Sequence, residues 1–232
     1  MTNIKEELLK LQDEKYKEFN NSLCPDNNRK MIGIRVPILR EFSKKLLREY
    51  SLDEIVCFID TEYFEEVMVR GFCIAYTKME LKDKCKYIDD FIPLIDSWAI
   101  TDSFVPSLKI KKDELEFVWE YIKKYLKSDK EFYIRFAVII LLDYFVIDTY
   151  VDKVIEVLNN ISHEGYYVKM GVAWCLCEIG IKYYDKFISY MKSDENKLDK
   201  FTYNKSIQKM IESYRVTNEQ KNELRNLKKI KK

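Results

Sequence analysis

The sequence has 232 residues, with 40 Lys and Arg against 39 Asp and Glu, so its formal charge is +1. It contains only 5 Gly and 4 Pro, which favours helices joined by short turns and argues against a β-rich fold. No apolar run approaches the roughly 18 residues that span a bilayer, and residues 1–10 alternate charged and apolar types, unlike a signal peptide. We therefore expect a cytoplasmic protein with no membrane segment.

Helices are predicted along almost the whole chain. Apolar residues at helical spacing predict one helix over 4–22, ended by residues 25–28, and another from Pro37 to about Tyr50. Helix pairs follow. The first helices of the pairs are predicted over 52–59, 82–95, 112–126, 149–160 and 183–192. The second helices are predicted over 62–79, 97–110, 130–145, 165–182 and 203–214.

This order is typical of an all-α, HEAT-like helical repeat solenoid, an α-α superhelix of about six helix pairs. We expect a single domain over 1–232, because a repeat array of this length needs no second one. It would have capping helices at 1–50, repeats at 51–216 and a basic C-terminal helix or tail at 217–232. We also expect a monomer.

The charges are segregated although their total is near zero. Residues 200–232 contain ten Lys or Arg and three Glu, and residues 29–48 contain seven basic residues and one acidic residue. Because phosphate contacts depend on local potential, a chain with these basic regions could bind a polyanion while being neutral overall. The alternative for the C-terminal stretch is a solvated, frayed end.

The cysteines and the single histidine, His163, do not have the spacing of a metal site. Free cysteines in apolar helices pack as small hydrophobic residues. We therefore expect no metal, no cofactor and no catalytic thiol. The six cysteines are Cys24, Cys57, Cys73, Cys85, Cys175 and Cys177.

The second helices can be aligned so that one position is charged in all of them. The aligned residues are Arg70, Asp102, Arg135, Lys169 and Lys205, separated by 32, 33, 34 and 36 residues. Second helices line the concave side of such stacks, so this column is predicted to follow an inner groove. The alternative is that these side chains only meet solvent or pair with acidic neighbours.

Asp102 is the one acidic member of the column, and Trp98 lies one helical turn before it. Ser97 is a candidate cap for this helix. Arg135 and Trp174 would project from the next two second helices. Indoles, a carboxylate and a guanidinium suit a reaction in which a cation develops, such as hydrolysis of an N-glycosidic bond. Alternatively, Asp102 is an ordinary surface acid and Trp174 packs in the core.

The sequence resembles the AlkD-type DNA alkylation repair proteins, HEAT-like-repeat DNA glycosylases, over nearly its full length. Each matching segment is short, and it is their order at repeat spacing that is specific. They are MIGIRVP at 31–37, Leu39-Arg40, Ser97-Trp98 with Asp102, IRFA at 134–137, YYVKM at 166–170 with Ala173-Trp174, and NKSIQK at 204–209.

The resemblance implies an activity and the residues that carry it. The family's excision quartet falls on Trp98, Asp102, Arg135 and Trp174. The two indoles would cradle the deoxyribose, Asp102 would stabilise the oxocarbenium ion and position water, and Arg135 would hold the DNA backbone. Substrates would be cationic alkylpurines such as 3-methyladenine and 7-methylguanine in duplex or branched DNA. We expect DNA contacts from Arg35, Arg70, Arg135, Lys169, Lys205 and Lys209.

The sequence departs from the family at one place. Active members have an additional DNA-contacting helix between the first helix and the Gly-Ile-x-x-Pro turn, whereas here only residues 24–30 separate the predicted first helix from Met31. Two hypotheses therefore stand. The first is a DNA glycosylase for cationic alkylpurines. The alternative is a non-catalytic or weakly active DNA-binding or scaffold paralogue.

Overall fold

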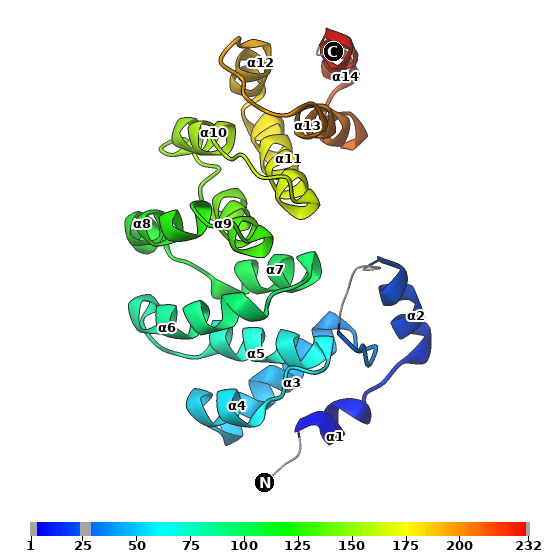
Figure 1. Ribbon diagram of the computed structural model, residues 1–232, viewed down its shortest axis with the longest axis vertical. Coiled ribbons are helices and arrows are strands. Elements are labelled where there is room, and N and C mark those ends of the chain that lie inside the picture. The colour runs from blue at the N-terminus through cyan, green and yellow to red at the C-terminus, as the bar shows by residue number, and fades with distance from the viewer. Residues whose placement is uncertain (1–3, 24–28, 231–232) are drawn as a thin grey trace. The chain divides into compact units, whose positions relative to one another are not determined.

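The computed structural model describes residues 4–23 and 29–230, and within them the chain is helical with short connections (Figure 1). The described residues contain no strand, only an isolated bridge between Lys30 and Tyr63. The predicted all-α helical-repeat fold is confirmed. The chain divides into two compact units, one ending at Glu114 and the other beginning at Leu115, and each is described by itself. The prediction of a single domain stays a prediction.

The helices of the first unit are α1 (Ile4–Leu9), α2 (Glu14–Leu23), α3 (Val36–Glu49), α4 (Leu52–Phe58), α5 (Phe64–Tyr76), α6 (Leu81–Phe91) and α7 (Trp98–Phe104), with 3₁₀ turns at Ile92–Leu94, Val105–Leu108 and Lys112–Glu114. Those of the second unit are α8 (Leu115–Leu126), α9 (Glu131–Tyr144), α10 (Val151–Asn159), α11 (Tyr166–Lys182), α12 (Tyr184–Lys192), α13 (Lys200–Glu212) and α14 (Asn218–Ile230). The pairs from α4–α5 to α12–α13 are those that the sequence predicted.

The prediction of one helix over 4–22 is wrong, because the chain forms α1 and α2 there. Asp13 causes the break. Its Oδ1 accepts the Tyr16 N–H at 3.0 Å, so it caps α2, and its own N–H donates to Gly33 O at 3.0 Å. Two helices therefore precede Met31. The predicted break at 25–28, like Cys24, lies outside the described residues.

Gly33 and Glu65 attach the segment before α3 to the start of α5. Gly33 has φ +95°, and a Cβ there would lie 2.5 Å from Lys17 Cβ, so only glycine fits. The Glu65 carboxylate, fully buried, accepts the N–H groups of Ile32, Gly33 and Ile34 at 2.9, 2.7 and 3.2 Å. A tight turn is thus fixed to the core helix of this unit.

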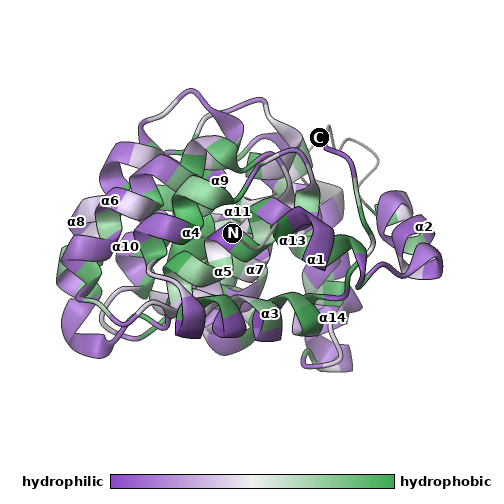
Figure 2. Ribbon diagram, turned by 90° about the horizontal axis from the view of Figure 1, so that it is seen from below, coloured by the Kyte–Doolittle hydropathy of each residue, from purple (hydrophilic) through white to green (hydrophobic). Residues whose placement is uncertain are grey.

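Helix α5 forms the centre of the first unit. All its residues from Phe64 to Ala75 are buried except Arg70. Figure 2 shows α5 as mainly hydrophobic and α2 as mainly hydrophilic. Arg40 of α3 packs over the Phe72 ring at 4.6 Å and donates to the Tyr76 hydroxyl at 2.5 Å, so this member of the basic stretch 29–48 stabilises the unit from inside.

Three cysteines are packed as the sequence predicted, whereas Cys57 is exposed and Cys85 is half-buried. Cys73, Cys175 and Cys177 are buried, and burial raises the pKa of the Cys73 and Cys177 thiols to about 12. In the described part of the chain no group of His, Cys, Asp and Glu could hold a metal ion. None of the helices described is long and apolar enough to cross a membrane.

Candidate nucleic-acid interface

Helix α7 presents Trp98 and Asp102 as its sequence predicted. Ser97 is the N-cap, and its hydroxyl accepts the Ala99 N–H at 3.3 Å. Trp98 is therefore the first residue of the helix, and Asp102 follows one turn later on the same face. Both side chains are partly exposed. The capped helix thus places an indole in its first turn and a carboxylate one turn later on the same face.

Arg29 anchors the segment that leads into α7. Its Nη2 donates to Leu94 O at 3.0 Å, its Nε lies 2.8 Å from Asp96 Oδ2, and its Nη1 donates to Thr61 O. Burial raises the pKa of Asp96, although the Arg29 guanidinium opposes this. Sequence reasoning did not identify Arg29 as a residue that supports this site. The one available signal was Asp96, two residues before Trp98, and its partner Arg29 is 67 residues away in the chain. Arg29 thus holds the entry to α7 against the connection between α4 and α5.

Arg135 of α9 packs against α11, the helix that carries Trp174. Arg135 is 4% exposed, and its Nη1 donates to Tyr167 O at 2.7 Å. A Cβ at Gly171 would lie 3.5 Å from the same nitrogen, so the guanidinium lies along the first turns of α11. Trp174, partly exposed, is one turn further along that helix.

The predicted quartet therefore consists of two pairs. Trp98 and Asp102 belong to the first unit, while Arg135 and Trp174 belong to the second. Each pair is held by contacts inside its own unit. Each pair has one indole and one charged group about one helical turn apart or on packed helices, and the sequence predicted that the four side chains together would suit a reaction in which a cation develops.

Two arginines of the predicted DNA-binding set have partners inside the first unit. Arg70 is half-buried and donates through Nη1 to Val56 O of α4 at 3.4 Å, and burial lowers the pKa of its guanidinium. Arg35 is exposed, but its Nη2 lies 3.3 Å from Asp13 Oδ2 and its guanidinium lies 4.7 Å from the centre of the Tyr16 ring. Both cations are thus partly engaged by neighbouring helices.

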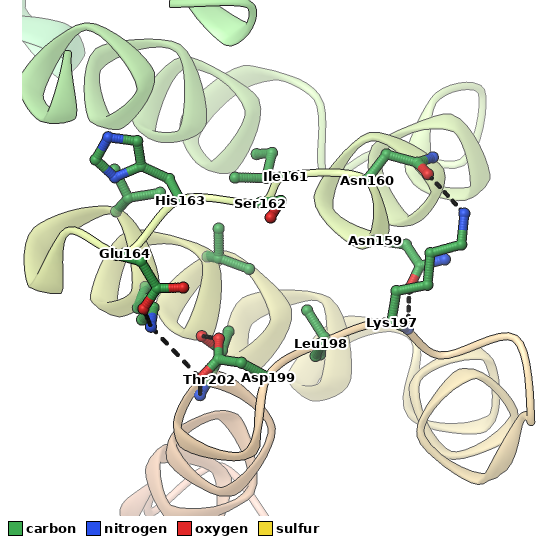
Figure 3. Close-up of a pocket in the computed structure, with 13 residues that line it drawn as sticks. Asn159, Asn160, Ile161, Ser162, His163, Glu164, Lys197, Leu198, Asp199 and Thr202 are labelled. Atoms are coloured by element: carbon green, nitrogen blue, oxygen red, sulfur yellow. Dashed lines mark hydrogen bonds and ion pairs between the residues drawn. The ribbon is translucent and has the colours of Figure 1, made fainter. Parts of the chain in front are cut away.

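Lys169 lies in a pocket of the second unit, with a volume of about 280 Å³, between the α10–α11 and α12–α13 connections (Figure 3). Its Nζ lies 2.7 Å from Glu164 Oε2 and 3.9 Å from Asp199 Oδ1. The hydrogen bond to Glu164 raises the pKa of Lys169. The Glu164 side chain is 96% exposed. A solvent-exposed carboxylate therefore occupies the position at which Lys169 would meet a phosphate.

His163 and Lys197, two other polar residues of the pocket, form hydrogen bonds with the protein. His163 Nδ1 accepts the Gly165 N–H at 2.9 Å, and its Nε2 donates to Asp129 O at 3.0 Å. Lys197 donates to Asn160 Oδ1 at 3.0 Å, a contact visible in Figure 3. These bonds hold the α10–α11 and α12–α13 connections in place. Among the residues that line this pocket, Lys169 is the one for which the sequence predicted a function.

Lys205 and Lys209 differ from the other predicted cations. They lie one turn apart on α13, partly exposed, and neither forms an ion pair with any residue that the structure describes. Uncompensated cations one turn apart on a helix are suited to contact phosphates. The five aligned residues therefore share a position in the repeat but not an environment.

The fold and these two pairs define a class: a helical-repeat protein that presents indoles and charged side chains from its second helices. The family model described as DNA alkylation repair enzyme matches residues 4–210. The chain belongs to that family, and the resemblance found in the sequence is confirmed. The match includes every predicted site residue from Arg35 to Lys209 and ends before α14. No match was found among the curated proteins.

Proposed function

We propose that this DNA alkylation repair protein is a DNA glycosylase that hydrolyses the N-glycosidic bond of cationic alkylpurines, such as 3-methyladenine and 7-methylguanine. The observation that carries this proposal is the capped α7 with partly exposed Trp98 and Asp102, in a chain of this family. DNA would be bound as a duplex or branched substrate by a protein monomer.

The reaction follows from the charges. The bond from C1′ to the base nitrogen breaks, and its electron pair moves to the base and neutralises the positive charge that alkylation placed there. The sugar becomes oxocarbenium-like, which the Asp102 carboxylate and the indole faces of Trp98 and Trp174 stabilise. Water oriented by Asp102 then adds to C1′ and releases a proton, leaving free base and an abasic site. Because the base is already a good leaving group, no flipping into a base pocket is required.

Arg135 and the lysines of α13 would bind the backbone. The Arg135 guanidinium contacts α11 at Tyr167 and at Gly171, the latter one turn before Trp174, so we expect a phosphate next to the sugar to be within its reach. Lys205 and Lys209 supply the uncompensated positive charge, while Arg35, Arg70 and Lys169 add to it when their present partners are displaced.

The direct test is the release of free base. Wild-type protein in excess over DNA treated with a methylating agent should release 7-methylguanine and 3-methyladenine, identified by mass spectrometry against a protein-free blank. With the protein concentration above the dissociation constant for the DNA, release no greater than the blank would contradict the glycosylase proposal, because nearly all the DNA is then bound.

One observation favours the alternative of a DNA-binding scaffold without excision. Four of the six predicted DNA-binding cations, Arg35, Arg70, Arg135 and Lys169, already bond to groups of the protein. The presence of both α1 and α2 removes the other argument for it, which was a missing second helix before Met31. A scaffold would bind DNA in a salt-dependent way, weakened by Arg135→Ala and Lys169→Ala, without base release.

The Glu164–Lys169 pair predicts a variant with stronger DNA binding. In Glu164→Gln the carboxylate no longer competes with phosphate for Lys169, so affinity for duplex DNA should rise about two- to fivefold, the range of an exposed ion pair. Fluorescence anisotropy at low salt measures it. Glu195→Gln, which removes an equal charge from an exposed residue of the next connection, is the control. An equal gain in DNA affinity in both variants would show an effect of net charge and contradict competition between Glu164 and phosphate for Lys169.

A further inference from the structure

Helix α14 is firmly packed on the second unit. Leu224 and Leu227 are 0% and 3% exposed, and Glu223 accepts from Lys192 Nζ at 2.7 Å and from the Tyr184 hydroxyl at 2.9 Å. Figure 1 shows the helix beside α13. The basic C-terminal segment is therefore a docked helix in its described part, which contradicts the alternative of a solvated, frayed end.

One face of α14 is a row of cations. Lys221, Arg225 and Lys228 follow one another at four and three residues, so they form a stripe beside the buried leucines. None of the three forms an ion pair within the described residues: Arg225 donates to Asn222 Oδ1 at 2.7 Å and Lys228 to Gln208 Oε1 at 2.6 Å. Their positive charge is uncompensated.

This stripe is continuous with the lysines of α13. Lys228 reaches Gln208, which precedes Lys209 directly and lies one turn after Lys205. The acidic residue in the middle of α14, Glu223, is turned to the other side, where it binds Lys192 and Tyr184. The same Gln208 side chain donates to Glu212 Oε1 at 2.6 Å, so one carboxylate lies next to these cations. Lys205, Lys209 and the three cations of α14 form one surface, which we call the α13–α14 basic surface and which carries five positive charges beside Glu212.

We propose that the α13–α14 basic surface binds the phosphate backbone of DNA flanking the repaired nucleotide. This rests on the proposed function, and it adds Lys221, Arg225 and Lys228, which lie beyond the residues that the family model matches. A DNA backbone is the occupant indicated because the helical rise places these residues roughly 6 and 4.5 Å apart along the axis of α14. Flexible side chains at that spacing can each meet a different phosphate, and each such interaction adds sequence-independent affinity.

The test neutralises the stripe without touching the leucines that dock α14. In the triple variant Lys221→Gln, Arg225→Gln, Lys228→Gln, we measure binding to unmodified duplex DNA by anisotropy over a series of salt concentrations. The slope of log K against log salt should fall by roughly 2 to 3, at about 0.9 for each phosphate that the variant no longer neutralises, and affinity near 0.1 M salt should fall about tenfold or more. The thermal midpoint should stay that of the wild type.

The matched control is Lys123→Gln, Lys127→Gln, Lys153→Gln, which removes three positive charges from the groove between α8 and α10 in the same unit. Equal loss in both variants, or an unchanged slope in the α14 variant, overturns the proposal. The proposal is also overturned if polyglutamate displaces the labelled DNA as effectively as unlabelled DNA of equal charge does. That result would indicate an acidic protein as the partner. DNA binding that depends on α14 in a protein without base release supports this surface and contradicts only the glycosylase. Base release by a protein whose DNA binding does not depend on α14 supports the glycosylase and contradicts only this surface.

Discussion

A protein carrying Asp102→Asn is expected to lose base release by about 10²- to 10³-fold, the effect of removing one group that stabilises charge in a transition state. The amide keeps the shape of the side chain on α7 but has no negative charge to stabilise the oxocarbenium ion and accepts a proton poorly. Single-turnover kinetics with saturating enzyme measures the loss. Binding to DNA should stay the same or become tighter, because the variant loses a negative charge.

The control for this prediction is Asp113→Asn, which removes an equal charge from an exposed residue of the same unit. It should retain wild-type release. Equal activity of wild type and Asp102→Asn would show that the carboxylate takes no part in the chemistry, and the site would then have to be sought elsewhere. Parallel thermal unfolding curves would show that the two variants are folded alike.

The second large effect is expected for stability. Glu65→Gln should lower the free energy of unfolding by about 2–4 kcal/mol, because one buried carboxylate accepts three backbone N–H groups. An amide offers one oxygen, and its NH₂ group would face an N–H donor, leaving buried donors unsatisfied at about 1–3 kcal/mol each. Denaturant unfolding followed by circular dichroism measures the change.

Glu66→Gln provides a matched comparison at the next residue, which is 1% exposed. One Glu66 oxygen accepts the Tyr63 N–H at 2.8 Å, the other is buried without a hydrogen bond, and burial raises the pKa of this carboxyl. An amide also removes a buried charge, so the loss should be below about 1 kcal/mol. Similar losses of unfolding free energy at both positions would mean that the three N–H donors bound by Glu65 do not stabilise the fold more than the single donor bound by Glu66.

Much of the fold could be predicted because helix signals are local. Ser97 before Trp98 predicts the start of α7, Pro37 falls in the first turn of α3, and apolar periodicity gives the helix pairs. The same periodicity failed at 4–22. The apolar pattern continues across the break. The helix is interrupted by Asp13, which caps α2 locally and donates its N–H to the carbonyl oxygen of Gly33, a residue distant in the chain.

For the candidate site, the sequence by itself determined which residue types stand at the repeated position and that Trp98 and Asp102 share a helix face. Only the tertiary structure decided what each charge contacts. Arg135 is bound to Tyr167, Lys169 to Glu164, and Lys205 remains without an ion pair in the described chain. A helix face is set by residues within one turn, whereas the partner of a charged side chain comes from a neighbouring helix or connection. The repeat spacing therefore places the column but does not determine which of its cations are available to DNA.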